Sequence, residues 1–327
     1  MIDQTFSKLL VMFNNFKLSL PVCLLLLSAI NGKSQVIEKF VELRSDTIVF
    51  PITLISVYPF ITGTVNGVTG KFMFDTGYET SIALNDNYLD LPNKKVKGSS
   101  VTGSGQSFKT HINDGVGEIK FPNGLIYRNL DNITSGNYDF LQKYITPDCV
   151  GYIGHDFFRG YLFKLDYLHS KVTFYKSTPE RRKYKDFLKN EKVVAVLDFE
   201  IRNLVNHPLV KFTIDGIKMI GAFDTGQNGT LQLDRNAAKR LKSRKTILVS
   251  GVNGNGDTLH MVKKILFNGN FATNLKGLEL ADQKAFGTLK KKNGITESNL
   301  MTIGYRFLLQ FKTVWDYTER KIYVLEY

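Results

Sequence analysis

The sequence predicts an all-β protein with few short helices, built as two similar lobes. Three observations support this prediction: short runs with β-branched alternation, Asx-Gly turns that end such runs, and a set of landmarks that occurs twice in the same order. The chain has 327 residues, of which 43% are hydrophobic and 12% aromatic. This composition is enough to form real hydrophobic cores, so we expect a globular protein.

The first 34 residues are predicted to be a signal peptide rather than part of the fold. Lys17 precedes a short apolar run at 18–30, and the small residues Gly32 and Ser34 stand at the two recognition positions of a cleavage site before Gln35. The run is shorter than the roughly 20 residues that a membrane span needs. We therefore expect an exported protein that is periplasmic, held at the cell surface or secreted, without a stable membrane span once the signal is removed. An uncleaved anchor is the alternative.

Charge and cysteine content narrow the classes of partner. The formal net charge is +13, but the basic clusters do not interleave with aromatic residues, so we expect no nucleic-acid partner. These clusters are expected on the solvated surface, with attraction to anionic envelope surfaces as the alternative. After removal of the signal, Cys149 is the only cysteine, so an intramolecular disulfide is excluded and a buried thiol is expected.

The repeat begins with a strand, a turn and a second strand. Residues 58–67 and residues 207–216 are alternating runs that end in an Asx-Gly turn, which is typical of a β-hairpin. The strand that follows ends in both copies on Phe-Asp-Thr-Gly. The aspartate is the eighth residue after the turn glycine in each copy, so Asp75 and Asp224 occupy equivalent places.

Four later landmarks continue the repeat, with offsets of 145 to 151 residues between the copies. They are glycine-rich hairpin tips at 101–108 and 252–259, Asn-Leu pairs at 129–130 and 274–275, Ile-Gly pairs at 153–154 and 303–304, and terminal strands at 171–175 and 321–324. We therefore expect an N-terminal lobe at 35–175, a helical linker at 176–192 and a C-terminal lobe at 193–327.

Helices are expected at three places. The linker carries a helix start at Ser-Thr-Pro-Glu, residues 177–180, followed by charged residues. The second copy has a clear helix at 234–241, and the first copy is expected to have a shorter polar counterpart near 85–91.

The duplicated aspartate has a specific chemical meaning. If two similar lobes pack about a pseudo-twofold axis, their equivalent turns can meet there and place Asp75 beside Asp224. Two carboxylates that lie so near each other share one proton over a wide pH range, because ionising both is costly. One carboxylate can take a proton from water while the protonated one polarises a carbonyl, which is general acid–base hydrolysis of an amide.

The neighbours of each aspartate are expected to support the pair. Thr76 and Thr225 are expected to hydrogen-bond across the axis and hold the two turns together. Gly77 and Gly226 are expected to let the backbone approach closely and to offer N–H groups to the carboxylates.

The two Phe-Asp-Thr-Gly runs and the two Ile-Gly pairs resemble those of the aspartic protease family, which includes pepsin and the retropepsins. The resemblance covers nearly all of residues 50–327 and implies two acid-protease β-barrel lobes related by a pseudo-twofold axis. It implies an aspartic endopeptidase in which Asp75 and Asp224 are catalytic, with a peptide or protein substrate. No metal or organic cofactor is expected, and a monomer, as an intramolecular pseudo-dimer, is expected.

The resemblance also offers an interpretation of the glycine-rich hairpins. In retropepsin-like dimers each lobe carries a mobile flap over the cleft. The flap residues predicted from the two tips are Gly103, Ser104, Gly105, Gly254, Asn255 and Gly256. Two ordinary surface hairpins are the alternative.

The sequence departs from the family at one position in each turn. Tyr78 and Gln227 stand where the family prefers a small residue after Asp-Thr-Gly. A catalytically impaired relative that binds peptides outside the cytoplasm is therefore the alternative function. Cation binding ranks last, because two carboxylates supply too few oxygens for Ca²⁺.

Other polar residues are assigned no chemistry. His155, His169 and His207 lack metal-ligand spacing, so surface or packing roles are expected. Asn132 and Asn228 begin glycosylation sequons, but a glycan on Asn228 would sit against the proposed pair, so that site is predicted to be unused.

Overall fold

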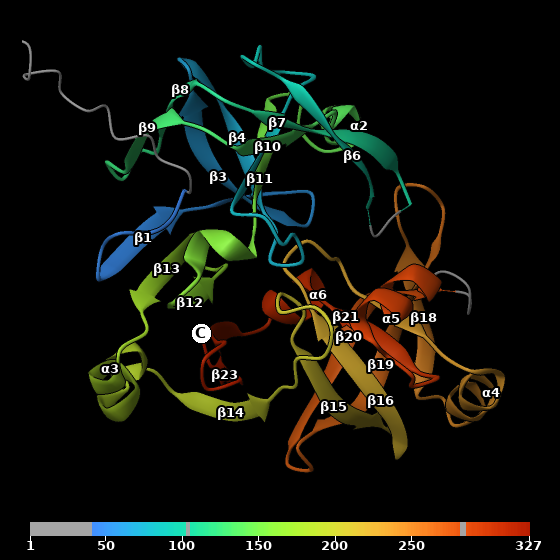
Figure 1. Ribbon diagram of the computed structural model, residues 1–327. Coiled ribbons are helices and arrows are strands. Elements are labelled where there is room, and N and C mark those ends of the chain that lie inside the picture. The colour runs from blue at the N-terminus through green and yellow to red at the C-terminus, as the bar shows by residue number, and fades with distance from the viewer. Residues whose placement is uncertain (1–40, 103–104, 282–285) are drawn as a thin grey trace, which may run out of the picture. The chain divides into compact units, whose positions relative to one another are not determined.

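Strands predominate in the computed structural model, which describes residues 41–102, 105–281 and 286–327 (Figure 1). The all-β fold with few short helices is confirmed. The predicted signal peptide, and Gly103 and Ser104 of the first hairpin tip, lie outside the described residues. All described residues belong to one compact unit, 37–327.

The first half of the chain forms a ten-stranded sheet. Its strand order is β6 (Lys95–Val101), β7 (Ser107–Asn113), β10 (Ile133–Gly136), β5 (Ile82–Asn85), β11 (Cys149–Ile153), β4 (Val68–Phe74), β3 (Tyr58–Val65), β8 (Val116–Lys120) and β9 (Ile126–Leu130), and β2 (Thr53–Ile55) pairs with β3. The predicted turn between β3 and β4 is present. Asn66 and Gly67 both have positive φ, of 48° and 86°, as a two-residue hairpin turn of type I′ requires.

The second half repeats this plan in a seven-stranded sheet. Its order is β15 (Leu209–Ile214), β16 (Ile217–Phe223), β21 (Leu300–Ile303), β17 (Thr230–Gln232), β20 (Phe271–Ala281), β19 (Thr258–Phe267) and β18 (Ile247–Val252). Strand β15 also pairs with β19, so the sheet closes on itself. In both halves the strand that leads to the Ile-Gly pair lies parallel to the strand that leads to the aspartate.

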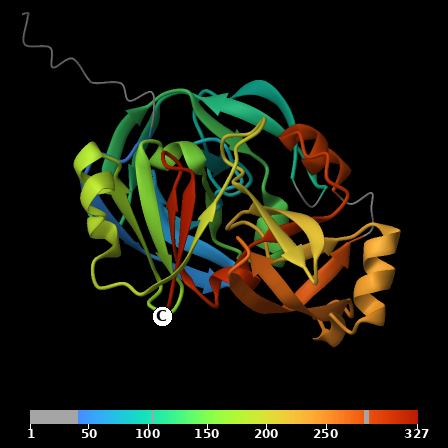
Figure 2. The same cartoon turned by 90° about the horizontal axis from the view of Figure 1, so that it is seen from below.

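A six-stranded sheet is built from both halves, which the sequence did not predict. Its order is β1 (Thr47–Pro51), β13 (Lys171–Lys176), β12 (Tyr161–Asp166), β22 (Lys312–Asp316), β23 (Lys321–Leu325) and β14 (Val193–Asp198). The order is symmetric about its centre, where β12 pairs with β22 and Phe163 lies opposite Trp315. Figure 2 shows these green and red strands side by side. The terminal strands of the two copies therefore join the halves instead of closing each one separately.

Aromatic packing fixes the two aspartate turns to this joint sheet. Phe74, the last residue of β4, is fully buried and packs edge-on against Phe163 at 5.6 Å between ring centroids. Phe223, the last residue of β16, packs edge-on against Trp315 at 5.6 Å. Burying each such side chain contributes about 1.5–3 kcal/mol. The residue before each aspartate thus has a fixed place in the core.

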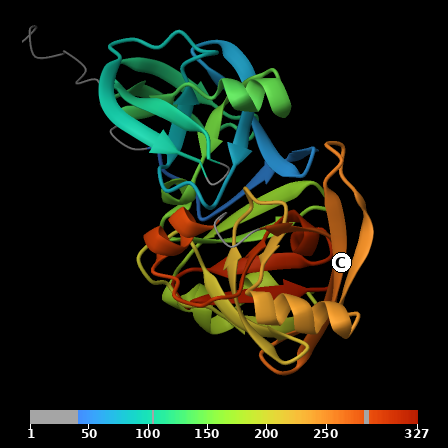
Figure 3. The same ribbon diagram turned by 90° about the vertical axis from the view of Figure 1, so that its right-hand side faces the viewer.

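The described helices are short. They are α2 (Asp139–Tyr144), α3 (Pro179–Tyr184), α4 (Arg235–Ser243), α5 (Gly287–Asn293) and α6 (Tyr305–Leu308), with 3₁₀ turns η2 (His155–Phe158) and η3 (Asp186–Leu188). The predicted helix starts in the linker and in the second copy are confirmed, with Thr178 and Asp234 as N-caps whose side chains accept a backbone N–H. Figure 3 shows α4 in front of the C-terminal sheet.

The predicted helix near residues 85–91 is wrong. That stretch ends β5 at Asn85 and continues as a turn. The buried Asn85 side chain donates to the Cys149 carbonyl at 2.9 Å and accepts from the Tyr138 amide at 3.0 Å. An asparagine committed to distant backbone groups favours the strand end over a helix.

Candidate active site

The structure brings the two Asp-Thr-Gly turns together. Thr76 donates its backbone N–H to the Thr225 hydroxyl at 3.0 Å, and Thr225 donates its own N–H to the Thr76 hydroxyl at the same distance. Both threonines are fully buried, although 149 residues separate them. The Thr225 hydroxyl also donates to the Phe74 carbonyl at 2.7 Å. These reciprocal bonds hold the turns against each other across the axis.

The two carboxylates share one backbone donor. The N–H of Gly77 donates to Asp75 Oδ1 at 2.9 Å and to Asp224 Oδ1 at 3.1 Å. The N–H of Gly226 donates to Asp224 Oδ1 at 2.8 Å. A Cβ at Gly77 would lie 2.4 Å from Asp224 Oδ2, and one at Gly226 would lie 2.5 Å from the Asp75 carboxyl carbon. Only glycine fits these positions, as close packing of the pair requires.

Burial and mutual repulsion change the proton affinity of the pair. The pKa of Asp75 is raised well above its ordinary value, first by burial, then by the charge of Asp224 and by a hydrogen bond with that carboxyl. The N–H groups of Gly77 and Tyr78 oppose this rise, because they stabilise the ionised form. Asp224 is only 7% exposed. The raised pKa favours the protonated form of the Asp75 carboxyl group.

The Ile-Gly pairs lie directly behind the turns. The Asp75 amide donates to the Ile153 carbonyl at 2.9 Å, and the Asp224 amide donates to the Ile303 carbonyl at 3.0 Å. A Cβ at Gly304 would lie 1.9 Å from the Gln227 carbonyl oxygen. The Ile-Gly pairs therefore hold the aspartate turns in place by backbone contact, which explains why the pair occurs in both copies.

Tyr78 does not direct its hydroxyl at the carboxylates. The hydroxyl forms a 3.0 Å hydrogen bond with the Tyr138 hydroxyl, and the ring stacks on Tyr152 with 4.8 Å between centroids. The bulky residue after the first Asp-Thr-Gly is thus part of a small aromatic core. In the second turn, the backbone carbonyl of Gln227 accepts from the Tyr305 amide at 2.9 Å.

Both predicted hairpins are present, and their role as flaps stays a prediction. Strands β6 and β7 pair over Lys95–Val101, and β18 and β19 pair over Ile247–Val252. In the second tip, the Asn253 side chain accepts the amides of Asn255 and Asp257, both at 2.9 Å. Asn253 also donates to Glu279 on β20 at 3.4 Å, which connects the tip to the neighbouring strand.

Three residues near the aspartate pair were not predicted from the sequence to belong to the site. Burial first, and then the charges of Asp75 and Asp224, raise the pKa of Tyr58. Burial lowers the pKa of His207, opposed chiefly by the charge of Asp224. Tyr58 and His207 occupy equivalent positions in the repeat, each directly before a proline. This equivalence is the feature of the sequence from which their place near the aspartates could have been predicted. Asn206 donates to the Gly77 carbonyl at 2.6 Å and had no such signal.

His155 and His169 have the packing and surface roles that the sequence predicts. His155 is buried, with its ring 4.7 Å from that of Tyr317, and His169 contacts Asp166 at 2.9 Å from an exposed position. Within the described ranges, no group of three or more His, Cys, Asp or Glu side chains could hold a metal ion. Cys149 is buried and unpaired, and burial raises the pKa of its thiol to about 12.

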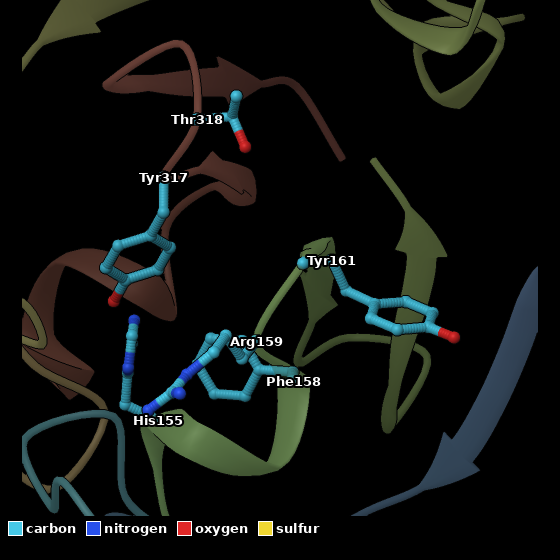
Figure 4. A pocket seen from close by; sticks show the side chains of 7 residues that line it. His155, Phe158, Arg159, Tyr161, Tyr317 and Thr318 are labelled. Atoms are coloured by element: carbon cyan, nitrogen blue, oxygen red, sulfur yellow. The ribbon is translucent and has the colours of Figure 1, made fainter. Parts of the chain in front are cut away.

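A cavity of about 160 Å³ lies beside His155 (Figure 4). In Figure 4 the His155 ring points toward the hydroxyl end of Tyr317. Phe158, Arg159, Gly160, Tyr161 and Thr318 complete its lining. Neither aspartate lines this cavity, so it is separate from the paired carboxylates.

Comparison with known proteins supports the fold. No protein-family model and no curated protein matches the chain. Among solved structures, basic 7S globulin from soybean is similar, with a TM-score of 0.53 and 9% sequence identity over 86% of this chain and 95% of that chain. That protein has an aspartic-protease-like fold of the pepsin type. The likeness shows the all-β two-lobed fold of this chain, and at this identity it shows the fold alone.

In the part of the chain that the structure describes, no helix is both long and apolar enough to cross a membrane.

Proposed function

We propose that this protein is an aspartic endopeptidase whose catalytic pair is Asp75 and Asp224. The observation that carries the proposal is the shared donor: one N–H, that of Gly77, bonds both carboxylates at the axis between two equivalent turns. Two carboxylates so close favour a state with one proton, which supplies an acid and a base at the same place.

The two carboxyl groups are assigned different roles. Asp224 Oδ1 accepts from two backbone N–H groups, at 2.8 and 3.1 Å. Asp75 has a pKa raised well above its ordinary value, so it holds the proton more readily. We therefore assign Asp224 as the general base and Asp75 as the general acid of the resting enzyme.

Hydrolysis then needs only water and the two carboxyl groups. Asp224 takes a proton from water while the water oxygen attacks the peptide carbonyl carbon, and Asp75 donates its proton to the carbonyl oxygen. In the tetrahedral intermediate, Asp224 returns its proton to the amide nitrogen and Asp75 recovers a proton from a hydroxyl. The C–N bond breaks, an acid and an amine leave, and the pair regains its starting state.

The substrate is proposed to be an extended peptide held by the main-chain groups of the two hairpin tips, as in strand addition. Gly105 lies at the first tip and Gly254, Asn255 and Gly256 at the second, and each tip follows its aspartate by about 30 residues in sequence. We propose that the enzyme acts as an exported monomer, in the periplasm, at the cell surface or in the medium.

Cleavage of a peptide library tests the proposal. The wild-type protein is compared with Asp75→Asn and Asp224→Asn at acidic and neutral pH. We expect cleavage by the wild type and a loss of at least about 10³-fold in kcat in either variant, because each removes one half of the acid–base pair. Cleavage that persists unchanged in both variants would exclude this pair as the catalytic group.

A second candidate is a catalytically impaired relative that binds peptides. The observation in its favour is that the Tyr78 hydroxyl bonds Tyr138 and leaves the first turn without the small hydroxyl that the family prefers. The same library distinguishes the two functions. Peptides that bind the wild type and are recovered intact at every pH would favour the binding protein.

A further inference from the structure

We propose that Asn206 is a positioning residue that lowers the proton affinity of the aspartate pair, acting from the second half of the chain on the first turn. Its Nδ2 donates to the Gly77 carbonyl at 2.6 Å, across 129 residues of sequence. The side chain is 2% exposed, so water does not compete for this bond. This inference rests on the proposed function, since it concerns the same pair.

The bond acts through a single peptide unit. The Gly77 carbonyl and the Tyr78 amide belong to the same peptide group, and the Tyr78 N–H donates to the main-chain carbonyl of Asp75 at 3.1 Å. A peptide whose carbonyl accepts a hydrogen bond is polarised and donates more strongly through its N–H. Asn206 therefore strengthens the backbone bond that closes the first turn and holds Asp75 in place.

The same contact fixes the shared donor. The Gly77 N–H is the group that bonds both Asp75 and Asp224, and Asn206 fixes the carbonyl of that residue. A glycine in a turn has more backbone freedom than any other residue, so an external hydrogen bond is an effective restraint on it. The distance from this N–H to the two carboxylates is thus set partly by Asn206.

Only the first of the two aspartate turns is restrained by an asparagine side chain in this way. The residue equivalent to Asn206 in the first copy is Val57, which has no side-chain donor for the second turn. Asn206 also keeps a buried Oδ1 without a hydrogen-bond partner, an arrangement that costs stability. An apolar side chain such as that of Val57 would avoid this cost, so the use of asparagine points to the bond with Gly77. The pair is consequently asymmetric although the fold is nearly symmetric.

Two variants test the proposal in the full-length protein. Asn206→Val removes the donor and copies the equivalent residue of the first copy. Without the donor, the N–H groups stabilise the carboxylates less, so the pKa values of the pair rise and both limbs of the pH profile of kcat/KM move to higher pH. We expect kcat to fall about tenfold while KM stays within about twofold, because the change acts on the pair and not on substrate binding.

Asn206→Asp provides a pH-dependent rescue. The introduced carboxyl group can donate to the Gly77 carbonyl only when it is protonated. The ratio of its activity to that of the wild type should therefore approach one at low pH and fall as the pH rises. A ratio independent of pH, or an unshifted profile for Asn206→Val, would overturn the proposal.

Asn113→Val is the matched control. Asn113 is also buried, also donates to a backbone carbonyl, that of Ile133, at 2.9 Å, and also has an Oδ1 without a partner. Its loss should lower the melting temperature as much as the Asn206 substitution does, but leave the pH profile in place. Equal shifts in both profiles would show that the effect of Asn206 is merely structural.

A ¹³C carboxyl NMR titration separates this proposal from the proposed function, because it needs no turnover. The midpoint of Asp75 should move to higher pH in Asn206→Val and stay in place in Asn113→Val. An unmoved midpoint in Asn206→Val overturns the positioning role even if the enzyme is active. A moved midpoint in a protein that cleaves no peptide supports the role of Asn206 and overturns only the peptidase.

Discussion

Thr76 and Thr225 exchange two equivalent hydrogen bonds, each donating its backbone N–H to the other's hydroxyl at 3.0 Å. Because both threonines are fully buried, water cannot replace these hydrogen bonds. The two turns therefore depend on each other for satisfied polar groups. Together with the pairing of β12 with β22, this exchange explains why the two halves of the sequence form one unit.

Thr225→Ala should lower the free energy of unfolding by about 1–3 kcal/mol, because it leaves the buried Thr76 N–H without an acceptor. It also removes the donor to the Phe74 carbonyl. Urea denaturation measures the change. Thr225→Ser keeps the hydroxyl and should retain most of the stability, which makes it the control.

The double substitution of both threonines gives a sharper test of the exchange. Because each alanine breaks a bond of the same buried network, the loss for Thr76→Ala with Thr225→Ala should be smaller than the sum of the single losses. Strictly additive losses would mean that the two hydroxyls act independently.

Gly226→Ala should lower the rate of peptide cleavage by roughly 10²-fold or more while leaving most of the fold intact. The added Cβ would lie 2.5 Å from the Asp75 carboxyl carbon, so the carboxyl must move. Even a shift of about 1 Å can cost roughly 10²-fold in rate. Kinetics on a cleaved library peptide measure the loss, and circular dichroism checks the fold.

Gly287→Ala is the control for that substitution. Gly287 begins α5, and a Cβ there would meet no atom within 4 Å. This change should leave activity unaltered and stabilise the helix slightly. Full activity of Gly226→Ala would show that the carboxyl group is not held as closely as the structure indicates.

The repeated landmarks predicted most of what surrounds the pair. Two equal glycine-to-aspartate spacings gave Asp75 and Asp224 equivalent places, directly after β4 and β16, and the repeated Ile-Gly pairs stand at the ends of β11 and β21. The type I′ turn at Asn66-Gly67 followed from residue chemistry alone. These features are local, or are repeated at a fixed offset, so a single sequence contains them.

Structural features that occur in only one of the two copies of the repeat could not be predicted from the sequence. Asn206 has valine as its counterpart, so the repeat gave no reason to single it out. Asn85 lies in a polar stretch that was expected to be the counterpart of the helix at 234–241, but its side chain bonds the distant Cys149 carbonyl. The six-stranded sheet shared by the two halves was not predictable, because the sequence of a strand does not determine which other strand pairs with it.

The stability of the protein should depend on pH through Asp75. A carboxyl whose pKa is raised by folding binds its proton more tightly in the folded state than in the unfolded state. Its contribution to stability is therefore fully present below the ordinary value of 3.8 and is lost as the pH rises toward the raised pKa. Asp75→Asn removes this loss, so the variant should gain stability over the wild type as the pH increases.

Denaturant unfolding of the two proteins at a series of pH values measures that difference. Asp46→Asn is a useful comparison, because Asp46 is an exposed carboxyl whose pKa is lowered chiefly by a hydrogen bond from Arg181. That variant should show the opposite trend, losing stability relative to the wild type as the pH rises. Parallel curves for wild type and Asp75→Asn would contradict a raised pKa at Asp75.

Tyr78→Phe tests whether the departure from the family pattern affects the chemistry. In the structure the hydroxyl bonds Tyr138 and not the carboxylates, so its removal should leave kcat/KM and the pH profile within about twofold of the wild type. Stability should fall by about 0.5–1.5 kcal/mol for the lost hydrogen bond. Tyr78→Ala, by contrast, also removes the ring stacked on Tyr152 and should cost about 3–5 kcal/mol.

Kinetics and urea denaturation of the two Tyr78 variants distinguish a structural from a chemical role. A tenfold or greater fall in kcat for Tyr78→Phe, at unchanged stability, would mean that the hydroxyl reaches the pair during turnover. The expected pattern is the reverse, with activity kept and stability lost. It follows from the geometry: the ring fills the aromatic core behind the first turn, and the carboxylates take their donors from the backbone of Gly77 and Gly226.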